Sequence, residues 1–299
     1  LTLLLSAPLA EAQDAPATLR ATFLDVGQGD STLLQLPGGE AILVDAGGSE
    51  GRRSRAPENR RAYDVGAHRV VPALRALGVK RIALLVISHP HADHVAGAEA
   101  VFQAFPVGEV WACWHAEPNR WIRRLGRWAA ARGVALRGPR RWRRGAFSLE
   151  PLWPLGWSKH RGAGGVERCG VPGLGANDNS VVLQARFGAS SLLLSGDIEE
   201  GVEENLLEAR APLAASVLKV PHHGSATSST LPFLRAVRPR LAVVSAGHGN
   251  RFGLPHGAVL ARYRRLGIEL LRVDTLGAVT VELGADGGVR WSRASSPLR

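Results

Sequence analysis

The sequence predicts an α/β (α+β) protein of one domain, in which buried strands alternate with amphipathic helices. Short apolar runs bounded by turn residues are typical of strands, and longer segments with apolar residues at helical spacing are typical of helices. The chain has 299 residues, 45% of them hydrophobic, so it can bury a substantial core. Length alone would allow two small domains, but the alternation runs along the whole chain and favours one.

Four of the expected strands form two hairpins. Residues 31–36 and 41–44 flank Pro37-Gly38-Gly39-Glu40, and residues 180–187 and 191–194 flank Gly188-Ala189. Further apolar runs at 82–87 and 217–220 predict buried strands. Helices are expected at 65–77, 95–105, 198–209 and 256–266, where apolar residues recur every three or four positions.

The segment Ser88-His89-Pro90-His91-Ala92-Asp93-His94 directly follows the buried run 82–87. Imidazole nitrogens and carboxylate oxygens are ligands of zinc and similar cations. A turn that leaves a strand can aim His89 and His91 at one ion, and Asp93 and His94 at a second ion about 3.5–4 Å away. One or two histidines on a solvated loop would arise by chance, but four residues of ligand type at this spacing predict a metal site.

Two later strands also end in residues of ligand type. The run at 192–194 leads to Gly196-Asp197, and the run at 217–220 leads to His222-His223. Alone, Gly-Asp is typical of a turn and paired histidines are typical of a surface. Their shared position at strand ends, after the first motif, favours one common site. The sequence leaves open which of His222 and His223 is the ligand.

The pattern His-x-His-x-Asp-His, followed by Asp197 and the histidine pair, resembles the signature of the metallo-β-lactamase superfamily of metallohydrolases. Residues 22–31, which contain Asp25-Val26-Gly27-Gln28-Gly29-Asp30, resemble the opening motif of the soluble hydrolase domain of ComEC-type DNA-uptake proteins. Residues 177–180, 219–225 and 249–256 also resemble that branch. The resemblance covers roughly residues 20–285. It implies a four-layer αββα sandwich, with two mixed sheets between helices and metals at the shared sheet edge.

The resemblance also implies the residues of the site. Two divalent ions, Zn or Mn, would be held by His89, His91, Asp93, His94, Asp197 and one of His222 or His223. Asp197 would bridge the ions, Asp93 would orient the attacking water, and the other histidine of the pair would orient substrate or protonate the leaving oxygen. The residues expected to contact phosphate or support the ligands are Asn179, Ser225, Asn250 and His256. Many relatives carry a histidine where Leu254 stands here, so a turn or core role for His256 stays open.

The opening motif predicts a tight turn beneath the metals. Gly27 and Gly29 would allow a close backbone approach that a side chain would obstruct. Asp25 and Asp30 would either reach the metals through water or cap the turn.

One departure from the wider superfamily bears on the substrate. Lactamases and thioester hydrolases of this fold carry a third histidine of the first site ahead of the bridging aspartate, whereas residues 177–180 read Asn-Asp-Asn-Ser. A first site with fewer protein ligands keeps more water or phosphate oxygens on its ion. We therefore expect a phosphodiesterase or nuclease that acts on DNA. The alternatives are a choline-phosphate-esterase-like enzyme of small molecules or the cell wall, a β-lactamase or thioesterase, and a binding protein with a relict site.

The charge balance indicates a polyanionic partner. The chain has 37 basic and 26 acidic residues and a net charge of +11. Ten arginines and three tryptophans lie in residues 120–144; arginine grips phosphate and indole can stack on unpaired bases. From this group we expect DNA contacts by Arg140, Arg141, Arg143 and Arg144. The alternative is compositional bias, because 34 of the 37 basic residues are arginine, with the tryptophans in the core.

The remaining signals concern the compartment. Residues 1–13 resemble the tail of a secretory signal, so we expect a leader at 1–18 ahead of a domain at 19–299, and a periplasmic or secreted protein; a cytoplasmic protein is the alternative. Cys113 and Cys169 could form one disulfide or remain free in the core. The longest apolar run is shorter than 18 residues, so no membrane span is expected. The sequence does not indicate an oligomeric state.

Overall fold

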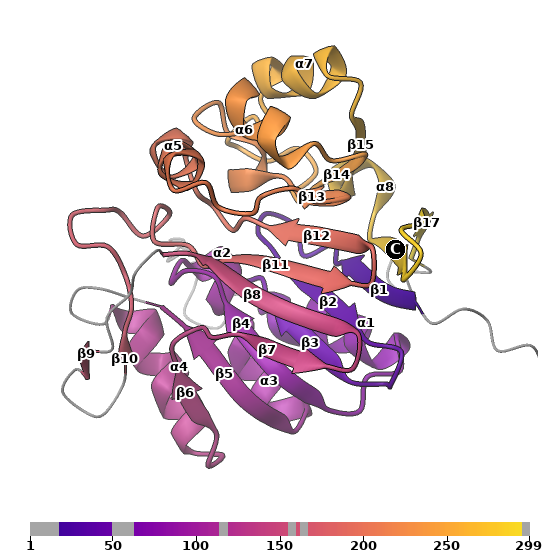
Figure 1. Ribbon diagram of the computed structural model, residues 1–299. Helices are drawn as coiled ribbons and strands as arrows, with labels where there is room; N and C mark the ends of the chain where they lie inside the picture. Colours follow the sequence, from indigo (N-terminus) through magenta and orange to yellow (C-terminus); the bar gives the residue numbers. More distant parts are fainter. Residues whose placement is uncertain (1–17, 50–62, 114–118, 155–159, 162–166, 295–299) are drawn as a thin grey trace, which may run out of the picture.

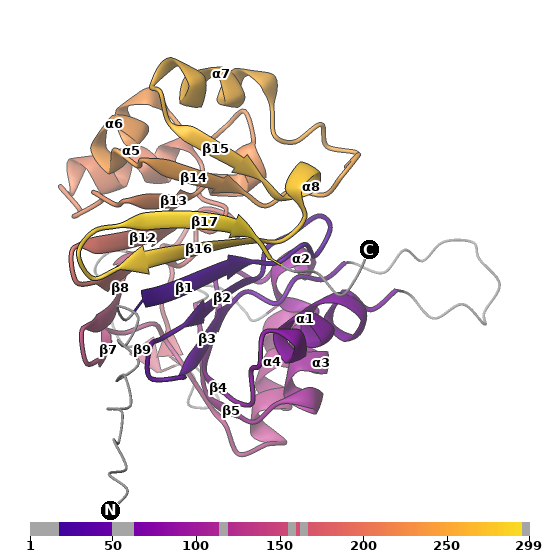
Figure 2. The same cartoon turned by 90° about the vertical axis from the view of Figure 1, so that its right-hand side faces the viewer.

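The protein is a four-layer sandwich of two facing mixed sheets covered by helices on both outer sides (Figures 1 and 2). The structure is a computed structural model that describes residues 18–49, 63–113, 119–154, 160–161 and 167–294. The leader predicted at 1–18 therefore lies outside the described residues, apart from Thr18, which begins the first strand. The α/β class and the sandwich architecture expected from the sequence are confirmed.

The first sheet has eight strands in the order β17-β16-β1-β2-β3-β4-β5-β6. Their bounds are β1 Thr18–Phe23, β2 Thr32–Gln35, β3 Ala41–Val44, β4 Ile82–Ile87, β5 Val107–Ala112, β6 Ala135–Arg137, β16 Val279–Gly284 and β17 Val289–Arg293. The pairs from β3 to β6 are parallel, and the other pairs are antiparallel. The predicted first hairpin is present as β2 and β3, paired from Thr32 opposite Val44 to Gln35 opposite Ala41.

The second sheet has seven strands in the order β15-β14-β13-β12-β11-β8-β7. Their bounds are β7 Trp142–Arg144, β8 Phe147–Trp153, β11 Val182–Phe187, β12 Ser190–Leu194, β13 Val217–Lys219, β14 Leu241–Val244 and β15 Glu269–Arg272. Strands β12 to β15 are parallel, and the predicted second hairpin is present as β11 and β12. The short strands β9, His160–Arg161, and β10, Glu167–Arg168, pair only with each other.

Helices cover the outer face of each sheet (Figure 1). The helices on the first sheet are a π-helix at Gly66–Val70, α1 Val71–Ala76, α2 Ala92–Val95, α3 Ala98–Ala104 and α4 Arg120–Ala130. The helices on the second sheet are α5 Glu200–Glu208, α6 Leu231–Val237 and α7 Gly257–Arg265. The four-residue α8, Val273–Leu276, links β15 to β16. The helix predicted at 95–105 is divided by Gly97, where an added Cβ would lie 2.1 Å from the carbonyl oxygen of Ala46. Gly97 thus lets the helix layer approach the loop after β3.

Three apolar layers hold the sandwich together. Phe23, Trp111 and Phe147 are fully buried between the sheets, while other apolar clusters join each sheet to its helices. Burying this apolar surface stabilises the fold by roughly 25 cal/mol per Å². The described residues contain no helix long and apolar enough to cross a bilayer.

The parallel strands of both sheets end at the same side of the sandwich. We call this side, where β3, β4, β12 and β13 end, the carboxyl edge, and the side where they begin the amino edge. The two sheets touch at the carboxyl edge, where the Val181 amide donates to the Ser88 carbonyl oxygen at 2.8 Å. The loops after these strands carry nearly all of the predicted ligand residues.

Candidate metal centre

Three loops at the carboxyl edge bring the predicted ligand residues together. His89, His91, Asp93 and His94 follow β4, Asp197 follows β12 and His223 follows β13. Among the described residues, Asp30, His94, Asp197 and His223 offer ligand atoms within 4.8 Å of one another, and all four are buried. The strand order explains this convergence, because β4 and β13 lie in different sheets whose parallel strands end at one edge.

Each buried histidine presents the same nitrogen to the centre. The Nδ1 atoms of His94 and His223 lie 2.9 Å from Asp45 Oδ2 and 2.8 Å from the Ser245 carbonyl oxygen, respectively. Nδ1 of His89 lies 3.1 Å from Ser88 Oγ. A partner on Nδ1 fixes the ring and leaves Nε2 free to bind a metal, which is the usual arrangement of a metal-ligating histidine.

These nitrogens converge on one oxygen of Asp197. Asp197 Oδ2 lies 3.2 Å from His94 Nε2, 3.3 Å from His223 Nε2 and 3.8 Å from His89 Nε2. The exposed His91 joins them, with its Nδ1 3.0 Å from His89 Nε2. Two donors on one tetrahedral ion at about 2.0–2.1 Å would lie about 3.3 Å apart, so these spacings fit shared ions.

The remaining carboxylate is Asp93. Its Oδ2 lies 3.6 Å from His223 Nε2 and 3.9 Å from His94 Nε2, and its side chain is one-third exposed, so it lies at the rim. His223 Nε2 is buried and has no hydrogen-bond partner. A buried nitrogen left without a partner is costly unless a ligand satisfies it. The donor set therefore fits divalent cations.

The structure distinguishes His223 from His222 as the metal ligand of the pair, a choice that the sequence left open. His223 is buried and its Nε2 faces Asp197, whereas His222 is half-buried and its Nδ1 lies 3.1 Å from Glu199 Oε1. Both residues have a positive φ, 45° for His222 and 52° for His223. Such a conformation is uncommon outside glycine and marks a turn held by its surroundings. Here the strained turn directs His223 inward and His222 to the rim.

Sequence reasoning missed Asp45, which supports the site from behind. Asp45 follows β3 with φ 59°, and its carboxylate accepts hydrogen bonds from the Ser88 amide and hydroxyl, both at 2.7 Å, besides contacting His94. The signal was available, because Asp45 follows a buried strand as Asp197 does. Burial alone would lower the pKa of His94, but Asp197, Asp45 and Asp93 raise it well above the ordinary value. A metal ion would take the place of that proton.

Asp30 lies behind the histidines. Its oxygens lie 3.8 Å from His94 Nδ1 and 3.6 Å from His223 Nδ1, the sides of the rings that face away from Asp197 Oδ2. Burial opposes its ionisation, yet Lys219 and the two histidines lower the pKa of Asp30 to about 2. Asp30 therefore stays ionised and supports the ligands from behind.

Of the two glycines in the turn beneath the site, Gly29 makes the predicted close approach, whereas a Cβ at Gly27 would meet no atom within 4 Å and only its φ of 77° favours glycine. Gly29 has φ 130°, and a Cβ built on it would lie 2.2 Å from the Asp93 carbonyl oxygen. Asp25 caps the same turn by accepting a hydrogen bond from the Gly27 amide at 3.2 Å, and it also pairs with Arg69 at 3.3 Å. The turn-capping alternative thus describes Asp25.

The four predicted phosphate-contacting residues organise loops. Asn179 bonds to the backbone of residues 171, 174 and 175, and Asn250 to that of 247, 252 and 254. Ser225 Oγ lies 3.0 Å from Thr227 Oγ1. His256 caps α7, with its Nδ1 accepting from the Ala258 amide at 3.3 Å. These contacts explain their positions by loop structure.

The structure does not bring Arg140, Arg141, Arg143 and Arg144 to the metal residues. Arg144, in β7, pairs in register with Phe147, which lies at the opposite end of β8 from Trp153. The seven residues of β8 span roughly 20 Å, and the Trp153 end is the one that meets the loops of the carboxyl edge. These arginines therefore lie towards the amino edge.

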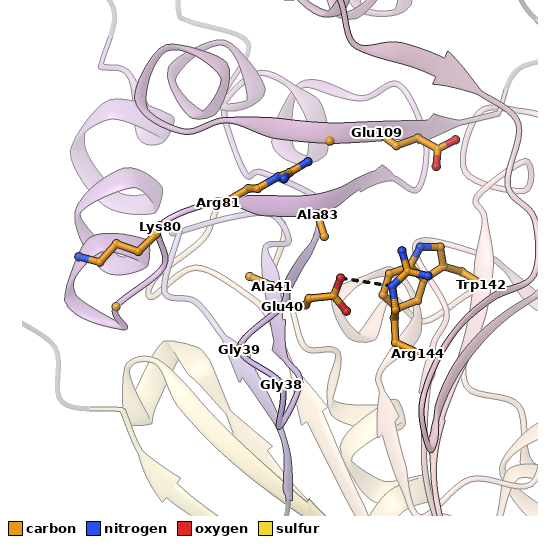
Figure 3. Close-up of a pocket in the computed structure, with 12 residues that line it drawn as sticks. Gly38, Gly39, Glu40, Ala41, Lys80, Arg81, Ala83, Glu109, Trp142 and Arg144 are labelled. Atoms are coloured by element: carbon orange, nitrogen blue, oxygen red, sulfur yellow. Dashed lines mark hydrogen bonds and ion pairs between the residues drawn. The ribbon is translucent and has the colours of Figure 1, made fainter.

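Three of them have acidic partners there. Arg140 pairs with Glu109 at 2.6 Å, Arg144 with Glu40 at 3.3 Å and Arg141 with Glu150. Arg144 and Trp142 also line a cavity of about 560 Å³ at this edge, together with Glu40, Glu109, Lys80 and Arg81 (Figure 3).

Helix α4, which carries four other arginines of this segment, begins beside the metal residues. Helix α4 carries exposed arginines at 120, 123, 124 and 127 and no acidic residue. Its N-cap, Asn119, accepts from the amides of residues 121 and 122 and donates to the Pro90 carbonyl oxygen at 3.0 Å, inside the histidine motif. Trp121 is buried in the core beneath the helix, as the compositional alternative expected.

The two cysteines, which the sequence left either paired or free, do not form a disulfide. Cys113 and Cys169 are buried free thiols, and burial together with the neighbouring Cys169 raises the pKa of Cys113 well above its ordinary value.

Comparison with known proteins places this geometry in a family context. A profile described as the metallo-beta-lactamase superfamily matches residues 24–248. ComE operon protein 3 of Bacillus subtilis (strain 168) is 29% identical over 272 residues, which cover 86% of this chain and 32% of that protein. Competence protein ComA of Neisseria gonorrhoeae is 36% identical over 225 residues, which cover 75% of this chain and 28% of that protein. The chain thus spans about a third of the length of these relatives.

Among solved structures, a mutant of the CmlA beta-hydroxylase superposes with a TM-score of 0.53 at 15% identity. The match covers 91% of this chain and 55% of that one. Similarity at this level of identity supports the fold and leaves the activity to be argued from the site.

Proposed function

Because the chain belongs to the metallo-β-lactamase superfamily, we propose that it is a two-ion phosphodiesterase whose substrate is DNA. The observation that carries the proposal is the convergence of His89, His94 and His223 on Asp197 Oδ2, with His91 and Asp93 alongside. The pair His89 and His91 would hold one ion, and Asp93, His94 and His223 the other. Asp197 would contact both.

The charge of the site supports two ions and a monoanionic substrate. Asp30, Asp45, Asp93 and Asp197 bring four negative charges, and Lys219 brings one positive charge, with the imidazoles neutral. With the imidazoles deprotonated, as metal ligands must be, this excess of three negative charges, most of it buried, is strongly unfavourable. Two divalent ions would turn it into a single positive charge, which the one negative charge of a phosphodiester balances. One ion would leave the site negative and repel that substrate.

Bound divalent ions supply Lewis-acid chemistry, because they acidify water and neutralise phosphate charge. The protein side chains contribute position. Asp93, at the rim, is placed to orient the attacking water. His222, also at the rim and held by Glu199 at 3.1 Å, is placed to donate a proton to the leaving oxygen. The first site lacks a third histidine, which leaves room for phosphate oxygens.

The DNA assignment is supported by the surface next to the site. Helix α4 presents four arginines to solvent and starts beside Pro90, between two of the proposed ligands. Guanidinium groups and the positive end of a helix both favour phosphate. A strand lying along α4 would pass its phosphodiesters to the carboxyl edge. One relative is named as a competence protein, and that name agrees with a role in handling DNA.

Incubation of the protein with Mn²⁺ or Zn²⁺ and three substrates in parallel tests the proposal. Single-stranded DNA, duplex DNA and bis-p-nitrophenyl phosphate should all be hydrolysed, with EDTA abolishing each reaction. Hydrolysis of the small diester without either DNA would instead identify a phosphodiesterase of small molecules. Hydrolysis of none of them, in protein shown to bind metal, would overturn the proposal.

A further inference from the structure

Lys219, the last residue of β13, is a buried cation beside the metal residues. Its side chain is 3% exposed, and it is the one lysine or arginine among the buried residues that the structure describes. The backbone around it is fixed, since its carbonyl oxygen accepts a hydrogen bond from Ser195 Oγ at 2.8 Å. Burying an ammonium is costly unless several partners surround it. The contacts of Lys219 therefore indicate its role.

The ammonium of Lys219 has three partners on two loops. It forms an ion pair with Asp30 Oδ2, donates a hydrogen bond to the Gly196 carbonyl oxygen at 2.9 Å, and lies 3.5 Å from Asp197 Oδ1. Gly196 and Asp197 belong to the loop after β12, and Asp30 to the loop after β1. Lys219 thus connects Asp30, which lies behind the histidines, to the loop that carries Asp197.

The two oxygens of Asp197 consequently have different surroundings. Oδ2 faces the Nε2 atoms of three histidines at 3.2–3.8 Å. Oδ1 faces the Lys219 ammonium and has no hydrogen-bond partner. From this asymmetry we propose that Lys219 is a positioning residue that holds Asp197 Oδ1 away from the ligand nitrogens, so that Asp197 joins the two metal ions through Oδ2 alone. The proposal rests on the two-ion centre of the proposed function.

Composition supports a requirement for an ammonium at this position. Lysine accounts for three of the 37 basic residues, and arginine fills the rest. A guanidinium is planar, larger and directed along a fixed fork, whereas an ammonium is compact and directs three donors to partners on different sides. Arginine at 219 would have to satisfy the same three partners inside a fully buried space. We therefore expect Lys219→Arg to fail as a replacement.

The competing explanation is that Lys219 only neutralises Asp30. Comparison of the double variant Lys219→Met/Asp30→Asn with Asp30→Asn alone separates the two roles, because both variants lose the Asp30 charge and only the double variant loses the ammonium. Lys219→Met alone leaves a buried carboxylate unpaired and is expected to destabilise the fold. The exposed Lys80 of the amino-edge cavity provides the matched control, Lys80→Met.

The test uses Mn²⁺ as the probe, with binding followed by calorimetry and the bound ions by electron paramagnetic resonance. Wild type and Lys80→Met should bind two ions and give the spectrum of an exchange-coupled pair. The double variant should keep its melting temperature near that of Asp30→Asn, bind the second ion at least about tenfold more weakly than Asp30→Asn does, and lose or change the coupling. Two ions bound with the affinity of Asp30→Asn and an unchanged spectrum in the double variant would overturn the positioning role.

The same measurements distinguish failure of the two-ion centre from failure of the role of Lys219. If wild type itself binds one Mn²⁺ or none, the two-ion centre is wrong and the role of Lys219 falls with it. If wild type binds a coupled pair and Lys219→Arg behaves like wild type in both affinity and spectrum, the requirement for an ammonium is wrong.

Discussion

The carboxyl and amino edges of the sandwich both gather charged residues from the two sheets, but they differ in how those charges are satisfied. At the amino edge, Arg140, Arg141 and Arg144 each have a glutamate partner and are largely exposed to solvent. At the carboxyl edge, imidazole and carboxylate groups are buried, and atoms such as His223 Nε2 have no partner. Exposed pairs contribute little to stability, whereas buried donors without partners indicate a missing ligand.

The comparison predicts its largest effect for Asp197. Asp197→Ala removes the oxygen on which three histidines converge, so hydrolysis should fall by roughly 1,000-fold or more while the apolar layers keep the fold. The matched change at the other edge, Glu109→Ala, should leave turnover of bis-p-nitrophenyl phosphate within about twofold, because the ion pairs of Glu109 are with Arg137 and Arg140, away from the metal residues. Retention of full activity by Asp197→Ala would show that the buried ligand residues of the carboxyl edge are not needed for hydrolysis.

The histidine pair sharpens the comparison within the carboxyl edge. His223→Ala should lower bound metal and abolish activity on every substrate. His222→Ala should keep the metal and lose roughly 100-fold on DNA, whose leaving oxygen needs a proton. It should lose little on bis-p-nitrophenyl phosphate, whose leaving group departs without one. Equal losses on both substrates for His222→Ala would contradict its role as proton donor.

Substitutions of glycine test whether the carboxyl edge differs from the amino edge in close packing as well as in charge. Gly29→Ala places a Cβ 2.2 Å from the Asp93 carbonyl oxygen at φ 130°, and it should cost roughly 2–4 kcal/mol of unfolding free energy. Gly38→Ala, in the hairpin at the amino edge, meets no atom within 4 Å and should change stability little. Urea denaturation measures both. Similar losses would mean that the turn beneath Asp93 tolerates movement.

The two edges also differ in what the sequence could predict. Strands such as β3 and β4 and the ligand-rich loop 88–94 follow from local pattern, because an apolar run and the spacing of His89 to His94 are visible in a short window. Asp45, Lys219 and the choice between His222 and His223 depend on how strands from both sheets end beside one another. The sequence contains Asp45 at the end of a strand, but its contact with His94 spans 49 positions and follows only from the topology.

The arginine-rich segment shows the same limit. Its charge is evident in the sequence, but the strand register decides which arginines lie near the metal residues. Arg144 opposite Phe147 points that part of the segment to the amino edge, whereas Asn119 bonded to Pro90 brings α4 to the carboxyl edge.

A smaller effect is expected from pH on the metal-free protein. The pKa values of His94 and His223 lie well above the ordinary 6.5, because nearby carboxylates outweigh burial. Their protonation therefore stabilises the folded state fully below pH 6.5, and this stability is lost as the pH rises through the raised pKa values. The carboxylates work the other way. Burial opposes the ionisation of Asp197, but His223 and His94 lower its pKa, so its contribution is present above its ordinary value of 3.8 and is lost as the pH falls below it.

Melting temperatures measured with EDTA and with Mn²⁺ between pH 5 and 9 test this balance. Metal competes with the protons on the histidines of the folded protein, so the gain in melting temperature from Mn²⁺ should grow as the pH rises towards the raised pKa values of His94 and His223. Parallel curves would show that the histidines are not the groups that Mn²⁺ occupies. Glu109→Ala should reproduce the wild-type difference, since the amino edge binds no metal in this scheme.

The smallest effect distinguishes the two groups of arginines. Arg124→Ser/Arg127→Ser should weaken binding of single-stranded DNA several-fold at low salt and reduce the slope of log K against log salt by up to about 1.4, because each phosphate contact contributes about 0.7. The loss of turnover on DNA should exceed the loss on bis-p-nitrophenyl phosphate at least threefold. Serine at Arg140, Arg141, Arg143 and Arg144 together removes twice the charge, yet it should change the slope less, because three of these guanidinium groups already have glutamate partners and lie towards the amino edge. A larger change of slope in the fourfold variant would place the DNA on the amino edge. It would then support the DNA contacts by Arg140, Arg141, Arg143 and Arg144 that the sequence predicted.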